Sequence, residues 1–135
     1  RYVSANQIHQ AGKISDPRKR QTFLAWLDRL EYEIFKIPQP DLVIYLDVPF
    51  EVSREWLKQK VARRRKKYLK RRKDVAEDNL LHLKNSRASA LSLTKRNKNW
   101  VRIKCCQEMV CLSPEQIHEQ VLAVVQGRLS IKATP

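Results

Sequence analysis

The stretch Pro40-Asp41-Leu42-Val43-Ile44-Tyr45-Leu46-Asp47-Val48-Pro49 decides the fold class of this chain. Residues 42–48 form a nearly unbroken apolar, β-branched and aromatic run, which predicts a strand covered on both faces. The flanking prolines stand where no ladder hydrogen bond is needed, at the entry and just past the exit. Open parallel sheets bind ligands beyond the carboxyl ends of their strands. We therefore expect Asp47 to point a charge toward a ligand-binding edge.

A predicted helix precedes this strand. Asp16 is suited to be its N-cap, and Pro17 to be its first helical residue. Apolar residues then recur at spacings of three and four, which indicates one buried helix face. That face comprises Phe23, Trp26, Leu27, Leu30 and Ile34. We expect these side chains to belong to the core rather than to a cofactor site.

Helical patterns also follow the strand. A helix over about 50–60 should turn Val52, Trp56 and Leu57 inward, and another is predicted over 78–95. The sequence Trp-Val-Arg-Ile at 100–103 is a short strand candidate. Ser113 opens a capping box that predicts a last helix, and Gly127 is a plausible stop for it. The alternation of helix, buried strand and helix is typical of an α/β fold.

The charge of the chain points to an anionic partner. It has 28 lysines and arginines against 14 acidic residues, a formal net charge of +14. Such an excess favours binding to a nucleotide, a nucleic acid or a lipid surface. No apolar run approaches the about 20 residues that a membrane span needs. We therefore expect no membrane partner. A length of 135 residues suggests about one domain.

The cysteines form a cluster of odd number, Cys105, Cys106 and Cys111. This pattern is more typical of a reducing compartment than of a disulfide framework. A zinc site would need a fourth ligand, and the only nearby candidate is His118. We therefore expect no metal site here, and the role of the cysteines stays open.

A basic run over residues 63–73 holds nine lysines and arginines in eleven positions. It suits a lid whose guanidinium groups bind phosphates in a bidentate manner. It equally suits a nucleic-acid or nuclear-targeting patch, for which basic runs are a familiar signal. A solvated charged helix is the simplest interpretation, and all three stay open.

The first 15 residues are rich in side chains that form hydrogen bonds. Amide side chains carry a donor and an acceptor together, so Asn6, Gln7 and Gln10 are suited to contact a base edge. A polar surface loop or a short helix explains the same composition more simply.

Taken together, these stretches resemble thymidylate kinase, a family of P-loop nucleoside monophosphate kinases. Arg1-Tyr2 resembles the end of that family's Asp-Arg-Tyr motif, and residues 6–13 resemble the thymidylate-binding stretch that follows it. Residues 40–48 resemble the strand Pro-Asp-Leu-x-x-Tyr-Leu-Asp-Val. Residues 63–73 stand where the family has its lid, and residues 74–77 are similar to the acidic motif that closes it.

The resemblance implies an α/β P-loop kinase fold over residues 1–127, a parallel sheet flanked by helices, with a lid at about 61–77. Residues 128–135 would then be an unstructured tail. The family's N-terminal strand and its loop G-x-x-x-x-G-K-[ST] are missing from this sequence. ATP and Mg²⁺ would bind through that missing part. The implied activity is phosphoryl transfer from ATP to dTMP by a cytoplasmic homodimer, with the fragment alone inactive.

By position, the resemblance assigns Arg1 to the monophosphate, Asn6 and Gln10 to the thymine edge, and His9 to stacking near the base. One lid arginine would reach the transferring phosphoryl group, where positive charge stabilises the transition state. The candidates are Arg63, Arg64, Arg65, Arg71 and Arg72. Two alternatives stay open: a deoxynucleoside kinase, and a non-catalytic nucleic-acid-binding module that uses residues 63–73.

Overall fold

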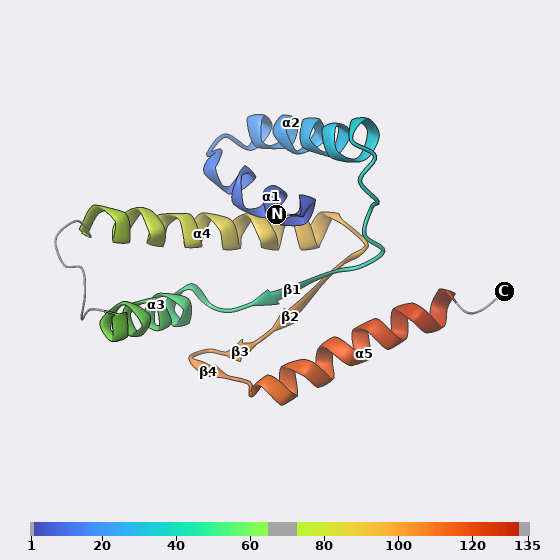
Figure 1. Cartoon of the computed structure of the whole chain (residues 1–135). Helices are drawn as coiled ribbons and strands as arrows, with labels where there is room; N and C mark the ends of the chain where they lie inside the picture. Colours follow the sequence, from blue (N-terminus) through green and yellow to red (C-terminus); the bar gives the residue numbers. More distant parts are fainter. Residues whose placement is uncertain (1, 65–72, 133–135) are drawn as a thin grey trace.

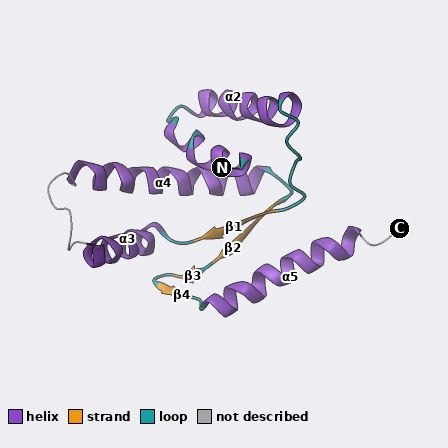
Figure 2. Cartoon of the chain, viewed as in Figure 1, coloured by secondary structure: helices purple, strands orange, loops and turns teal. Residues whose placement is uncertain are grey.

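A computed structural model describes residues 2–64 and 73–132, with side chains for 2–59 and 80–130. The described chain is mixed α/β, mostly helical with a small parallel sheet (Figure 1; Figure 2). Its helical segments are α1 (Val3–His9), the 3₁₀ turn η1 (Ala11–Lys13), α2 (Pro17–Asp28), the π-helical turn η2 (Arg29–Ile34), α3 (Phe50–Arg64), α4 (Lys73–Arg96) and α5 (Pro114–Lys132). Its strands are β1 (Val43–Asp47), β2 (Trp100–Lys104), β3 (Cys106–Gln107) and β4 (Val110–Cys111).

The central strand β1 lies where the sequence predicts it. It pairs in parallel with β2, with Val43 opposite Trp100 and Asp47 opposite Lys104. The strand predicted at 100–103 is thereby confirmed as well. Helices α3 and α4 lie between the two strands in the chain, because parallel strands cannot be joined by a tight turn.

The expectation that β1 is covered on both faces is only partly right. Leu46 is 48% exposed, although Asp47 beside it is 2% exposed. In the described part of the chain, β1 has a neighbouring strand on one side only. Successive side chains of a strand point to opposite faces, so Asp47 is covered on the α4 side while Leu46, on the other face, keeps contact with solvent.

One face of the sheet packs against α5 in an apolar core. Its buried residues are Val52, Ile103, Cys105 and Cys106. Half-buried side chains from β1, the residue after it, β4 and α5 pack around them, namely Ile44, Val48, Cys111, Ile117, Val121 and Val124. The opposite face, which carries Tyr45, Asp47 and Arg102, turns toward α4.

Small side chains bring α1 and η1 close to α4. Ala11 and Ala90 are 0% exposed, and Ser89 is 1% exposed. A Cβ atom on Gly12 would lie 3.2 Å from the carbonyl carbon of Asn85, so a larger residue here would push η1 and α4 apart by a few tenths of an ångström. The tight contact fixes α1, and with it His9, against α4.

The predicted start of α2 is confirmed, but its buried face is smaller than predicted. The Asp16 carboxylate accepts hydrogen bonds from the backbone N–H groups of Arg18 and Lys19, at 2.8 and 3.2 Å. Leu27 is buried, whereas Trp26 of α2 and Ile34 of the following turn η2 are 54% and 60% exposed. Helix α2 packs on the short α1 and η1, which are too small to cover the whole stripe.

Helices α3 and α4 also differ in part from the prediction. Val52 is buried as expected, but Trp56 is 52% exposed, so its assignment to the core is wrong. Helix α4 begins at Lys73, five residues before the predicted start. In the described ranges, we find no helix that is both long and apolar enough to cross a membrane.

The start of α5 is confirmed, and its end is a correction. The Ser113 N–H donates to Oε1 of Gln116 at 2.9 Å, and the Gln116 N–H donates to the Ser113 hydroxyl at 3.3 Å. The helix runs through Gly127 to Lys132, so neither the stop at Gly127 nor an unstructured segment directly after it exists. No described glycine has a positive φ angle, so Gly127 continues the helix instead of ending it.

Two of the three cysteines form a disulfide, contrary to the expectation from the sequence. Cys106 and Cys111 are bonded across the β3–β4 hairpin, and Cys105 is free and buried. Disulfides are more typical of oxidising compartments than of reducing ones. The expected cytoplasmic location stays a prediction.

Candidate functional site

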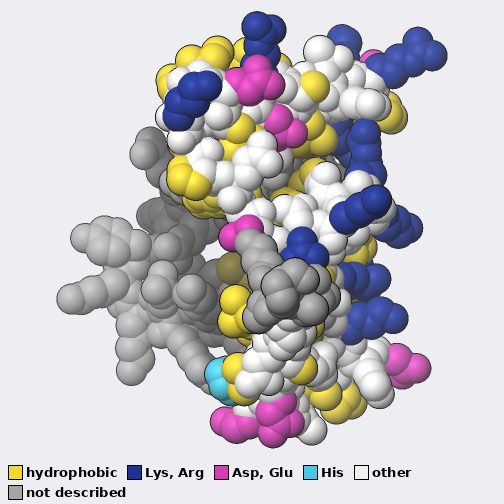
Figure 3. Space-filling model, turned by 90° about the vertical axis from the view of Figure 1, so that its right-hand side faces the viewer, with side chains coloured by type: hydrophobic (Ala, Val, Ile, Leu, Met, Phe, Trp, Pro, Cys, Tyr) yellow, Lys and Arg dark blue, Asp and Glu magenta, His cyan; other side chains and the backbone are white. Residues whose placement is uncertain are grey.

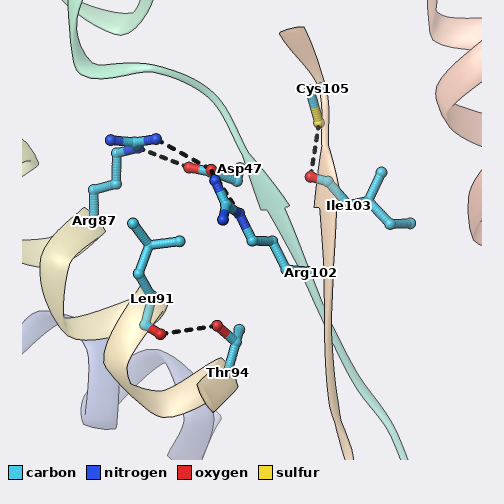
Figure 4. Close-up of polar contacts among 7 residues, drawn as sticks. All are labelled: Asp47, Arg87, Leu91, Thr94, Arg102, Ile103 and Cys105. Carbon is cyan, nitrogen blue, oxygen red and sulfur yellow. Dashed lines mark hydrogen bonds and ion pairs between the residues drawn. The ribbon is translucent and has the colours of Figure 1, made fainter. Parts of the chain in front are cut away.

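Asp47, at the carboxyl end of β1, is bound by two arginines from different elements (Figure 4). Arg87 of α4 donates through Nε to Oδ1 at 2.7 Å and through Nη2 to Oδ2 at 3.1 Å. Arg102 of β2 donates through Nε to Oδ2 at 2.9 Å. Asp47 does lie at the carboxyl end of β1, as expected, but its carboxylate is buried and joins α4 to the sheet.

The charges in this cluster follow from its contacts. Burial alone raises the pKa of Asp47, but the hydrogen bonds and charges of Arg87 and Arg102 outweigh it and leave the pKa below its ordinary value. The hydrogen bond to Asp47 raises the pKa of Arg87. Burial, and then the charge of Asp47, raises the pKa of the Cys105 thiol. Near neutral pH, Asp47 therefore stays a carboxylate, Arg87 a guanidinium cation and Cys105 a thiol.

A cavity of about 260 Å³ lies beside this cluster, at the carboxyl end of β1. Its apolar walls come from α1, β1, α3 and α4 and include Ile8, Tyr45, Phe50 and Leu83. Its polar lining consists of His9, Ser53, Ser86 and Arg87. A mostly apolar cavity with a few converging polar groups is the usual form of a small-molecule site, and this edge is where parallel sheets bind ligands.

His9 is held in this wall by two residues of α4. Its Nδ1 lies 3.2 Å from the hydroxyl oxygen of Ser86. Its ring stacks on that of His82, with centroids 5.3 Å apart and an interplanar angle of 27°. His82 Nε2 is 3.5 Å from the same hydroxyl. The orientation of the His9 ring is therefore set before any ligand binds.

Among the predicted substrate contacts that the structure describes, His9 alone lines the cavity. His9 lines it, whereas Asn6, half-buried, and Gln10, exposed, lie on or beside α1 without lining it. Arg1 lies outside the described residues. Arg65, Arg71 and Arg72 also lie outside the described residues. The backbone of Arg63 and Arg64 belongs to α3, but the side chains of these two residues are outside the described part. The lid assignments stay predictions.

Sequence reasoning missed Ser53, Ser86 and Arg87. The two serines look like ordinary helix-surface residues in the sequence, and nothing in the pattern brings them together. Arg102 could have been noticed, because a charge in a short predicted strand needs a partner. Its register opposite Tyr45 puts it on the same face as Asp47.

The described residues offer no site for a metal ion. No group of three or more His, Cys, Asp and Glu side chains among them is placed to hold one. We therefore assign no Mg²⁺ ligand to this part of the chain.

Comparisons of the chain with models of known protein families, with curated proteins and with solved structures give no match in any of the three.

Proposed function

We propose that this chain is the nucleoside monophosphate-binding part of a thymidylate kinase, with the P-loop kinase fold in its complete form. The motif order over residues 1–127 supports the proposal. So does the observation that carries it: His9, assigned to the base by resemblance, lines a cavity at the carboxyl end of β1.

The cavity suits a nucleoside in size and character. Its volume of about 260 Å³ is just below that of pockets for drug-sized ligands. Tyr45, Phe50 and Leu83 offer apolar surface to a base and its sugar, and His9 offers a ring whose orientation is fixed. The cluster of Arg87, Arg102 and Asp47 has one more positive than negative charge, which favours a monophosphate over an uncharged nucleoside beside it.

The open edge of β1 supports the complete kinase fold. The Val43 N–H donates to the carbonyl of Asn99 at 2.8 Å, and the Asp47 carbonyl accepts from the Cys105 N–H at 2.9 Å. Because successive residues of a parallel strand bond to opposite sides, the backbone groups of Ile44 and Leu46 point away from β2. We propose that a strand carrying the phosphate-binding loop pairs there.

Catalysis would then be divided between two parts of the protein. The described residues would bind and orient dTMP. ATP and Mg²⁺ would be held by the segment that carries the phosphate-binding loop, which supplies backbone donors and charge to the phosphates. We expect no turnover from the 135 residues alone, and homodimer formation stays a prediction.

Binding of dTMP to the full chain tests the proposal. Isothermal titration should show saturable dTMP binding, with thymidine at least about tenfold weaker. His9→Ala should weaken dTMP binding by about tenfold, because it removes one wall of the cavity. His118→Ala, which changes an exposed histidine of α5, is the matched control and should leave the affinity unchanged.

Three results would contradict the proposal: no dTMP binding, equal affinity of wild type and His9→Ala, or a preference for thymidine. The last would favour the deoxynucleoside kinase alternative.

A nucleic-acid-binding module is the second candidate, because positive charge is not confined to residues 63–73. Figure 3 shows lysine and arginine side chains along one margin of the visible face, and the net charge is +14. If the basic run neutralises about nine phosphates, log K should fall against log salt with a slope near −8 on duplex DNA. A slope of about −1 to −2 would remove this candidate.

A further inference from the structure

The strand β2 has a free edge on the side away from β1. In the described part of the chain, β2 pairs with β1 alone. The Cys105 N–H donates to the carbonyl of Asp47 at 2.9 Å, and successive residues of a parallel strand bond to opposite sides. The backbone N–H and C=O groups of Arg102 and Lys104 therefore point away from β1. We call this side the outer edge of β2, and no step of the proposed function uses it.

The outer edge is open to solvent. Arg102 and Lys104 are both exposed residues. Arg102 as a whole is more exposed than its side chain, which binds Asp47 and is 34% exposed. Its main chain is therefore accessible to solvent as well. Exposed backbone donors and acceptors at a strand edge are a template for pairing with a further strand.

The charge along this edge is positive. Residues 95–104, which form the end of α4, a turn and β2, hold five lysines and arginines and no acid. Lys98 and Lys104 form no ion pair with a described acid. A second copy of this edge would bring like charges together, which disfavours pairing between copies of the chain. An acidic strand would instead match the charge.

We propose that the outer edge of β2 binds an extended, acidic peptide segment of a partner protein, which adds a strand to the sheet. The peptide backbone pairs with the outward N–H and C=O groups of Arg102 and Lys104. Side chains alternate between the faces of a strand, so every second peptide side chain lies beside Arg102 or Lys104, where an acid is favoured. The side chains between them lie beside Val101 and Ile103, where an apolar residue is favoured.

Backbone pairing selects a peptide over a nucleic acid at this edge. A nucleic acid offers phosphates to the lysines and arginines, but it has no ladder of N–H and C=O groups at the spacing of a strand. Charge alone would accept either partner, so the test must separate the two contributions.

Titration of the full chain with a seven-residue peptide of alternating glutamate and valine, followed by ¹⁵N–¹H spectra, tests the proposal. We expect saturable shifts at Arg102 and Lys104, and binding at least about tenfold weaker for the same peptide with lysine in place of glutamate. Lys104→Glu should weaken binding of the acidic peptide at least about tenfold. Lys19→Glu makes the same change of charge on α2, and it should bind as the wild type does.

A methylated peptide keeps the test decisive if Lys104→Glu does not fold. Methylation of every backbone nitrogen of the acidic peptide keeps its charges but removes its N–H donors, and it should weaken binding to the wild type at least about tenfold. Equal affinity of the methylated and unmethylated peptides would overturn the proposal, as would wild-type affinity in folded Lys104→Glu or shifts that do not saturate. Shifts of Arg102 and Lys104 at a lower concentration of a DNA oligonucleotide than of the peptide would also overturn it.

Discussion

The two faces of the β1–β2 sheet are joined to their helices by different interactions. On the α5 side, Val52, Ile103 and Cys106 form a buried apolar cluster. On the α4 side, Asp47 binds Arg87 and Arg102 through directional hydrogen bonds. Apolar burial is non-directional and tolerates small shifts of a helix. A bidentate carboxylate–guanidinium contact fixes orientation as well as distance.

This difference matters because, of the two helices α4 and α5, only α4 lines the cavity that we assign to dTMP. Ser86 and Arg87 of α4 line that cavity, whereas α5 contributes no residue to it. We infer that the ion-pair cluster sets the orientation of the cavity wall, and that the apolar core mainly supplies stability. Variants on the two faces should therefore separate stability from binding.

The largest effect on stability is expected on the apolar face. Ile103→Ala removes a side chain that is 4% exposed, and we expect it to lower the free energy of unfolding by about 3–4 kcal/mol. Urea denaturation measures this change. Leu129→Ala, at a position 62% exposed on α5, should change it by less than about 0.5 kcal/mol.

Under conditions where Ile103→Ala is still folded, we expect it to keep the wild-type affinity for dTMP. A loss of affinity in the folded variant would contradict the division of roles between the faces.

A smaller loss of stability, but a larger loss of binding, is expected on the α4 face. Asp47→Asn leaves two guanidinium groups without their carboxylate. Removing one partner of a buried pair costs about 3–5 kcal/mol, and we expect about 2–3 kcal/mol here because the arginine side chains are 31% and 34% exposed. Loss of dTMP affinity in the folded variant is the decisive measurement, and Glu119→Gln is the control.

The pH dependence of the same variant sharpens this prediction. The folded-state pKa of Asp47 is lowered. The ionised carboxylate therefore adds to the free energy of unfolding at pH values above the unfolded pKa of about 3.9. It is lost as the pH falls through the folded value. Urea unfolding of the wild type should therefore approach that of Asp47→Asn below about pH 4. An equal stability difference at pH 7 and pH 3 would contradict the assigned ion pairs.

The smallest change in the free energy of unfolding is expected at the start of α5. Ser113→Ala removes the hydroxyl that accepts from the Gln116 N–H, which should cost about 1 kcal/mol. Thermal unfolding checks this value, and Ser130→Ala near the other end of α5 serves as the comparison. A cost equal to that of Ile103→Ala would mean that the cap, and not the apolar core, determines how α5 docks.

Local signals predicted the elements better than they predicted the contacts between them. The run between Pro40 and Pro49, the Asp16 cap and the Ser113 capping box each depend on neighbouring residues, and the structure confirms all three. Trp56 and Trp26 were assigned to the core by spacing alone. The spacing of apolar residues shows which face of a helix is apolar. It does not show whether another helix or strand packs on that face.

The candidate site was harder to predict for the same reason. His9 stood out in the sequence as one of several polar side chains and was assigned to the base only through a resemblance, and its contacts with Ser86 and His82 join residues more than 70 positions apart. The contact of α1 and η1 with α4 is formed by Gly12 and by small side chains such as Ser89 and Ala90. Such residues give a weak hydrophobic signal, so the periodicity of α4 did not reveal the face that it buries.

Mapping dTMP on the full chain by ¹⁵N–¹H spectra is the most direct test of the central claim, that the cavity at the carboxyl end of β1 is the nucleotide site. We predict saturable shifts at Ile8, His9, Ser53, Ser86 and Arg87. Shifts confined to α5 or to the outer edge of β2, or no shifts with saturating dTMP, would contradict it.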